Sequence, residues 1–161
     1  MQGRKIAIVA LLTGCAAPPS SDWDPAAASA LEGKIAGIFQ AMDSGNMDSV
    51  MAWADDDVVI YDFGPDNKPV TANGRAEAQA MFDGYAKAFK EGMKVHSTVG
   101  RTSCKATSSV GYCAVEFDQM MSAGGQNMGP FKFRGTMVAR KVGEEWKWTH
   151  WHGSFREMPE M

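Results

Sequence analysis

The segment WKWTHWHGSF, residues 146–155, brings several chemically active side chains close together near the end of the sequence. His150 and His152 stand two positions apart, and side chains two positions apart lie on the same face of a β-strand. Imidazole is the side chain whose ordinary pKa lets it gain or lose a proton between about pH 5 and 8. The pair is therefore a candidate for acid–base chemistry, for ligand binding or for metal binding.

Strict alternation along this strand predicts that one face carries Trp146, Trp148, His150, His152 and Ser154. The other face then carries Lys147, Thr149 and Trp151. The first set changes from apolar to polar along the strand, which is the gradient expected inside a cone with a packed base and an open mouth. We therefore expect the first set to face inward and Trp151 to face outward. A large apolar side chain on that outer face favours a homodimer contact through the convex side of the sheet.

Three interpretations of His150 and His152 remain open. They can be structural, with one ring nitrogen donating to a backbone or hydroxyl oxygen and the ring packed on Trp148. They can be acid–base or ligand-contacting groups in a pocket. They can also chelate a metal, but zinc needs a third protein ligand, for which His96 and Asp62 are the candidates. A bare His-x-His pair is a weak metal signal, so we expect no metal and no cofactor.

Further candidates lie near the ends of other strands. Asp62 is a candidate acid–base group, although it can equally be a turn residue that bonds its own backbone. Arg134 can hold a ligand carboxylate in a bidentate pair, or it can pair with Glu116 or Asp118 on the neighbouring strand. The predicted ligand-binding residues are Tyr61, Trp148, Arg134 and His96.

The first fifteen residues have the order of a secretory signal. A short basic region precedes an apolar run, residues 6–12, that is too short to span a bilayer. The Leu-Thr-Gly-Cys that follows resembles a bacterial lipobox, which implies removal of residues 1–14 and lipidation of Cys15. We therefore expect an exported protein, lipid-anchored on the periplasmic side of the cell envelope, with Ala16 favouring the outer membrane. Residues 15–28, rich in Ala, Pro and Ser, form the predicted tether.

The remaining residues, 29–157, suffice for one domain with one core. The net charge is −3 and the sequence has no basic cluster, so nucleic acid is not an expected partner. The expected partners are a small molecule, the membrane through Cys15 and a second copy of the chain.

The other two cysteines fit export. If Ser108 and Ser109 form a hairpin turn, Cys104 faces Cys113 across two strands at a distance that a disulfide accepts. An oxidising compartment allows the bond, which we predict, while two free buried thiols are the alternative.

Helical spacing of apolar residues predicts a helix after Asp24-Pro25, a short helix after Asn46 and a third helix capped by Asn73. A β-branched run at 58–60 predicts one strand, and after residue 92 the apolar period changes to two. Four antiparallel strands are expected there, near 93–104, 110–121, 131–141 and 145–154. The class is α+β, with three helices packed on the concave side of a curved sheet in a cone that the helices close at one end.

Three stretches carry a family resemblance. ALEGKIAGIFQAMDSGNMDSVMAWADDDVVIYDFGP resembles the opening of SnoaL-like domains in the nuclear-transport-factor-2-like superfamily, and NGRAEAQAMF resembles its third helix. FRGTMVARKVGEEWKWTHWHGSF is similar to its last hairpin, and MMSAGGQ is similar to the association domain of calmodulin-dependent protein kinases. The resemblance covers residues 29–155 and implies a cystatin-like α+β barrel.

The resemblance specifies the fold better than the function, because the superfamily holds isomerases, cyclases, dehydratases, binding modules and oligomerisation hubs. In resembling isomerases an aspartate near Asp62 is the general base, but Ile38 stands where they keep a tyrosine, and Ile cannot donate to an oxyanion. We expect a domain that binds a small, partly apolar ligand in its cone. The alternatives are an isomerase- or dehydratase-type enzyme using Asp62, His150 or His152, and a dimerisation module without catalysis.

Overall fold

The computed structural model describes residues 22–66 and 68–157. The elements in chain order are α1 (Pro25–Asp43), α2 (Met47–Met51), β1 (Ala54–Phe63), β2 (Pro69–Asn73), α3 (Arg75–Lys90), β3 (Lys94–Ala106), β4 (Val110–Ala123), β5 (Gln126–Val142) and β6 (Glu145–Phe155). The predicted signal peptide and Cys15 lie outside the described residues. Within the described part of the chain, no helix is both long and apolar enough to cross a membrane.

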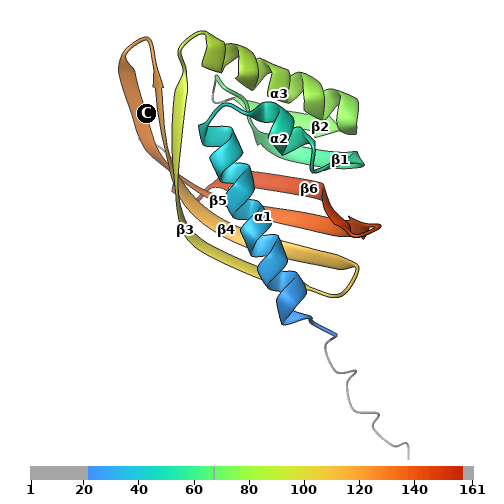
Figure 1. The fold of residues 1–161 in the computed structure, drawn as a ribbon. Coiled ribbons are helices and arrows are strands. Elements are labelled where there is room, and N and C mark those ends of the chain that lie inside the picture. The colour runs from blue at the N-terminus through green and yellow to red at the C-terminus, as the bar shows by residue number, and fades with distance from the viewer. Residues whose placement is uncertain (1–21, 67, 158–161) are drawn as a thin grey trace, which may run out of the picture.

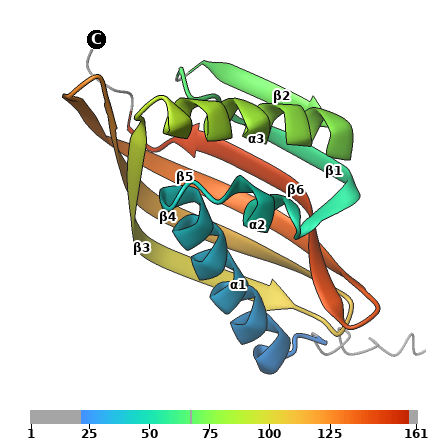
Figure 2. The ribbon, with the colours of Figure 1, turned by 45° about the horizontal axis from the view of Figure 1, so that its top comes forward.

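The six strands form one sheet in the order β2-β1-β6-β5-β4-β3. The β1–β6 pair is parallel and the other pairs are antiparallel. The sheet curves, and all three helices lie on its concave side (Figures 1 and 2). This confirms the α+β class and the helix-covered curved sheet. The expected barrel is wrong in one respect, because β2 and β3 are the two terminal strands, they do not pair with each other, and the sheet does not close on itself.

The helices begin largely where their capping residues predict. The Asp24 carboxylate accepts hydrogen bonds from the first backbone N–H groups of α1, with Pro25 at the first helical position. The Asn46 side chain accepts from Ser49 N and caps α2 in the same way. The third predicted helix is present as α3, but its predicted cap is wrong, because Gly74 occupies the capping position and the side chain of Asn73 does not cap the helix.

The predicted meander is confirmed. The strands β3, β4 and β6 lie within two residues of the expected ranges, β5 begins five residues earlier than expected, and Ser108 and Ser109 lie in the turn between β3 and β4. Cys104 stands directly opposite Cys113, with Cα atoms 4.1 Å apart, and the two form a disulfide. The short strand β2 was not predicted, because it has only five residues and begins at Pro69, which cannot donate to a strand ladder.

Side chains of α1 cover the edge strand β3. Asp43 accepts from the backbone N–H and the hydroxyl of Ser97, both at 2.8 Å. Glu32 accepts from the backbone N–H of Cys104 at 3.3 Å, and Asp24 N donates to Ala106 O at 2.7 Å. These bonds satisfy backbone groups of β3 that have no partner strand.

The position of every side chain after Trp148 depends on a bulge in β6. His150 pairs with Val138 and Trp148 pairs with the next residue of β5, Ala139, so Thr149 is an extra residue without a partner. A bulge of one residue reverses the alternation of side chains beyond it. Trp146 and Trp148 face the helices, as predicted, but beyond the bulge Trp151 also faces the core. The prediction that His150, His152 and Ser154 face inward is therefore wrong.

Two paired glycines make room for the reversed strand. A Cβ atom at Gly135 would come within 2.4 Å of the Trp151 ring, and one at Gly153 would come within 2.4 Å of Asp62 Oδ1. Gly135 of β5 stands directly opposite Gly153 of β6. The absence of side chains at this pair lets the indole and the carboxylate lie flat on the concave face.

Gly135→Ala tests this close packing. The added methyl group cannot be accommodated without moving the Trp151 ring, so we expect a loss of about 1–3 kcal/mol in the free energy of unfolding. The measurement is urea unfolding followed by tryptophan fluorescence. Gly84→Ala in α3 is the matched control, because nothing lies within 4 Å of its Cβ position. The control should gain about 0.5–1 kcal/mol from helix propensity. A Gly135→Ala protein as stable as the wild type would contradict the described packing of Trp151.

Candidate functional site

A cavity of about 70 Å³ lies between the helices and the concave face of the sheet. Its walls come from α1, α2, α3 and the central strands, and they are almost wholly apolar. The lining residues are Ile38, Phe39, Met42, Val50, Ile60, Phe82, Phe117, Gln119, Met137, Trp148 and Trp151. Such a lining excludes charged ligands and suits an apolar molecule.

Few polar groups reach this cavity. Trp148 is only 4% exposed, and its indole Nε1 has no hydrogen-bond partner within the described part of the chain. Gln119 donates from Nε2 to the Ser97 hydroxyl at 3.4 Å. A buried N–H without an acceptor costs free energy, so the Trp148 indole would gain from a ligand that carries an acceptor.

Asp62 and Trp151 form the polar edge of the site. Trp151 donates from Nε1 to Asp62 Oδ2 at 2.6 Å, and the indole itself is part of the cavity wall. Burial of the Asp62 carboxyl raises its pKa to about 6, although hydrogen bonds from the Phe63 backbone and from Trp151 act in the opposite direction. Asp62 itself is not among the residues that line the cavity.

Tyr85 is a second buried ionisable side chain near Asp62. Its hydroxyl donates to the carbonyl oxygen of Phe63, which follows Asp62 in β1. Burial raises the pKa of Tyr85 above its usual range, and the nearby Asp62 and Asp66 charges add to that effect. Tyr85 is therefore a neutral donor that holds the end of β1 against α3.

Asp55, the other buried carboxylate, serves the fold. It accepts two hydrogen bonds of 2.7 Å from the guanidinium of Arg140, in a bidentate pair that joins β1 to β5. This bond lowers the pKa of Asp55, although burial acts in the opposite direction. Because both carboxylate oxygens are occupied and the pair does not line the cavity, Asp55 has no role in the candidate site.

Three predicted site residues lie close together on the convex face of the sheet, whereas the predicted pocket is on the concave face. Tyr61, which is 45% exposed, has its ring centroid 5.9 Å from that of His150 and 6.4 Å from that of His152. All three point away from the helices, the two histidines because of the bulge at Thr149 and Tyr61 because it follows the inward-facing Ile60 in β1. Of the residues predicted to bind a ligand in the cone, Trp148 is the one that lines the cavity.

Arg134 and His96 also lie outside the cavity. Arg134 is on the convex face, where its Nε donates to the Ser154 hydroxyl at 3.4 Å. The alternative prediction paired Arg134 with Glu116 or Asp118. Arg156 forms these two ion pairs instead, each at 3.0 Å. His96 is on the edge strand β3, with its Nδ1 3.7 Å from Asp43.

These positions separate the residues of the metal hypothesis. His150 and His152 face away from the helices, Asp62 lies on the concave face and His96 belongs to the far edge strand. Among residues 22–66 and 68–157, no three histidine, cysteine or acidic side chains are close enough together to hold a metal ion.

Sequence reasoning missed Trp151, Phe117, Gln119 and Met137 as parts of the site. Trp151 was assigned to the outer face because strict alternation cannot anticipate an extra residue. One signal was present, since Gly135 and Gly153 interrupt strand patterns, and a glycine inside a strand indicates a bulge or a close approach by another group.

The chain belongs to the SnoaL-like domain family, whose model matches residues 33–158. No curated protein matches the sequence at a significant level. Family membership agrees with the order of elements, in which helices precede a curved meander.

Three solved structures show the breadth of the fold. An NTF2-like protein of unknown function from Pseudomonas putida KT2440 superposes with a TM-score of 0.68 at 17% identity, over 85% of this chain and 99% of its own. The CaMKII hub of S. rosetta has a TM-score of 0.61 at 20% identity, with coverage of 82% and 97%. A ketosteroid isomerase-like protein from Erwinia carotovora atroseptica SCRI1043 has a TM-score of 0.64 at 14% identity, with coverage of 84% and 100%. At these identities the likeness extends to the NTF2-like fold and no further.

The raised pKa of Asp62 predicts a pH dependence of stability. The folded protein holds this proton up to about pH 6, while the unfolded chain releases it near pH 3.8. The stabilising contribution is complete below pH 3.8 and is lost as the pH rises through 6. Relative to Asp62→Asn, the wild type should therefore lose up to about 3 kcal/mol between those limits. The measurement is urea unfolding from pH 4 to pH 8.

Asp56→Asn is the control for this series, since it removes an exposed carboxylate from the same strand. A difference between the wild type and Asp62→Asn that stays constant with pH would show that Asp62 is ionised throughout, and would contradict its burial.

Proposed function

We propose that this domain binds a small, mainly apolar molecule that carries one hydrogen-bond acceptor. The proposal rests on one observation, the apolar cavity whose wall includes Trp148, a residue whose buried indole N–H has no hydrogen-bond partner among the described residues. An apolar body would gain from burial, and a carbonyl or ether oxygen would satisfy the indole donor. The family membership supports a ligand-binding role without specifying the ligand.

The size of the cavity limits the ligand. At about 70 Å³ it is smaller than the roughly 300–1,000 Å³ of pockets for drug-sized molecules. A molecule seated without rearrangement therefore has only a few carbon atoms. Met42 and Met137 are in the wall, and unbranched thioether side chains can change rotamer to admit a larger body.

Trp148→Phe tests the role of the indole. Phenylalanine keeps an aromatic ring in the wall but removes the donor, so binding of cyclopentanone should weaken about two- to tenfold while binding of cyclopentane should not. The measurement is a titration followed by NMR, in which the indole N–H signal of Trp148 should move with the ketone and stay with the hydrocarbon.

Trp146→Phe is the matched control for this titration. Trp146 is 6% exposed, comes from the same strand and faces the same way, but it does not line the cavity. If both variants bind cyclopentanone as the wild type does, and the Trp148 signal does not move, the proposed site is wrong.

A second candidate function is catalysis of an isomerase or dehydratase type, with Asp62 moving a proton. The observation in its favour is a carboxyl group that titrates at about pH 6 beside the cavity wall, close to the pH at which an acid–base group works best. Against it, Asp62 is engaged by Trp151 and does not line the cavity. The geometry therefore supports binding better than catalysis, with Asp62 as the residue that positions the Trp151 indole.

We also propose that the protein is an exported lipoprotein anchored through Cys15 on the periplasmic side of the envelope. The signal-like order of residues 1–15 supports this proposal. The Cys104–Cys113 disulfide adds support, because such bonds persist in oxidising compartments and are rare in the cytosol.

Cys15→Ala tests the anchor. Cells grown with labelled palmitate should label the wild type and leave Cys15→Ala unlabelled, because the acyl chains need the Cys15 side chain and the N-terminus that cleavage before it creates. The double variant Cys104→Ser, Cys113→Ser controls for other thiols and should label as the wild type does. Label that persists on Cys15→Ala would overturn the proposed anchor.

The expected homodimer through the convex sheet was argued from an outward-facing Trp151. Trp151 faces the core, so this argument for the homodimer no longer holds. What remains in its favour is the likeness to a kinase hub. Whether the protein is a monomer or a dimer in solution is one of the outcomes measured in the anion-binding experiment proposed below.

A further inference from the structure

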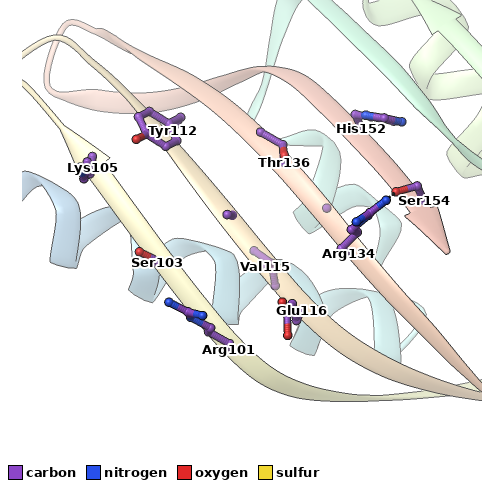
Figure 3. Close-up of a pocket in the computed structure, with 12 residues that line it drawn as sticks. Arg101, Ser103, Lys105, Tyr112, Val115, Glu116, Arg134, Thr136, His152 and Ser154 are labelled. Atoms are coloured by element: carbon purple, nitrogen blue, oxygen red, sulfur yellow. Dashed lines mark hydrogen bonds between the residues drawn. The ribbon is translucent and has the colours of Figure 1, made fainter. Parts of the chain in front are cut away.

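The convex face of the sheet carries a hollow of about 550 Å³, on the side opposite the helices (Figure 3). It crosses the strands β3, β4, β5 and β6. This site is separate from the apolar cavity, because the sheet lies between the two.

The strand registers explain why the surface is hollow there. Ser103, Ala114 and Thr136 stand opposite one another on three successive strands and form a floor of short side chains. Beside this floor, a second row of paired residues crosses the same strands and consists of Arg101, Glu116 and Arg134, with Glu116 between the two arginines. The next row on the other side of the floor contains Lys105 opposite Tyr112. Short side chains between two rows of long ones form a trough across the sheet, and Figure 3 shows this arrangement.

The trough is cationic in a protein of net charge −3. Among the described residues, its three permanent cations, Arg101, Lys105 and Arg134, form no ion pair. The carboxylate of Glu116, which stands between the two arginines, is engaged by Arg156 at 3.0 Å.

The other contacts of Lys105 and Arg134 are with neutral groups, so they do not neutralise the charge of either side chain. The Lys105 ammonium lies 5.8 Å from the centre of the Trp23 ring, and Arg134 donates only its Nε to Ser154. The guanidinium of Arg134 thus keeps its two terminal nitrogens for a ligand. These nitrogens are a planar pair of donors suited to a carboxylate or a phosphate.

We propose that the trough binds a compact organic anion with carboxylate or phosphate groups. Neighbouring strands lie about 4.8 Å apart, so Arg101 and Arg134 originate about 10 Å from each other on the same face of the sheet, on either side of Glu116. The hydroxyls of Ser103 and Thr136 on the floor add neutral donors. The anion has two possible sources, a soluble metabolite or the headgroup of an anionic lipid, and they share this chemistry.

The test is calorimetric titration of the full chain with citrate and with inorganic phosphate, at fixed ionic strength because salt screens exposed charges. Wild type should bind citrate with saturation, and amide signals of Ser103 and Thr136 should move in NMR spectra while the Trp148 indole signal stays. Arg134→Gln and Arg101→Gln should each weaken binding by about tenfold or more, as expected for loss of a charge-assisted hydrogen bond.

Lys90→Gln is the matched control, because it removes one exposed positive charge from α3, away from the trough. It should leave citrate affinity unchanged. Vesicles of phosphatidylglycerol distinguish the two sources. Binding to these vesicles that citrate displaces and Arg134→Gln weakens assigns the trough to a lipid headgroup, while citrate binding without vesicle binding assigns it to a soluble anion.

Three results would overturn the proposal. The first is that neither citrate, phosphate nor the vesicles bind. The second is that Lys90→Gln weakens binding as much as Arg134→Gln does, which would indicate a general charge effect. The third is a wild-type dimer in solution whose interface protects the amides of Ser103 and Thr136, since a second copy would then occupy the trough.

Discussion

The extra residue at Thr149 decides which face of the sheet each later side chain of β6 occupies. Two tryptophans of β6, Trp148 and Trp151, are three positions apart, and strict alternation would place them on opposite faces. The bulge puts both against the helices. The same step turns His150 and His152 to the convex side. In β6, the separation of apolar side chains on the concave face from histidines on the convex face therefore depends on one unpaired residue.

The bulge imposes further requirements on neighbouring strands. The indole of Trp151 needs space on β5, which Gly135 supplies, and its N–H needs an acceptor away from water, which Asp62 supplies. Asp62 in turn needs space over β6, which Gly153 supplies. A carboxyl group whose pKa rises on burial is a costly acceptor, so part of the folding free energy is used to hold one ring in the cavity wall. The arrangement favours a rigid wall over an accessible acid–base group.

Much of this fold could be predicted from local patterns. The cap at Asp24, the apolar stripe through Leu31 and Ile35, and the hairpin that joins Cys104 to Cys113 each depend on residues close in sequence or on a regular period. The failures have a common origin in interactions between distant segments. A bulge changes no residue type, so the facing of the histidines could not be inferred from spacing alone. Strand β2 is short and begins at a proline, and it exists because β1 offers it a partner.

The candidate site was predictable to a smaller extent. Of the residues predicted to bind a ligand, Trp148 lines the cavity, together with Phe39 of α1 and Phe82 of α3. The polar groups were misassigned because their direction depends on register across four strands, where an error of one residue exchanges the faces. Arg134 and His152 therefore belong to a different surface from Trp148, although all three lie on the neighbouring strands β5 and β6.

An open sheet has edges, and the covering of β3 by α1 affects how copies of the protein can associate. A bare edge is a template on which a strand from another molecule can add, and repeated addition produces fibres. Here the carboxylates of Glu32 and Asp43 take up amide groups that an incoming strand would need. The opposite edge, β2, is short and starts with Pro69, which has no N–H to offer. These features disfavour growth by successive strand addition at both edges of the sheet, so association between copies is expected through a face of the sheet rather than along its edges.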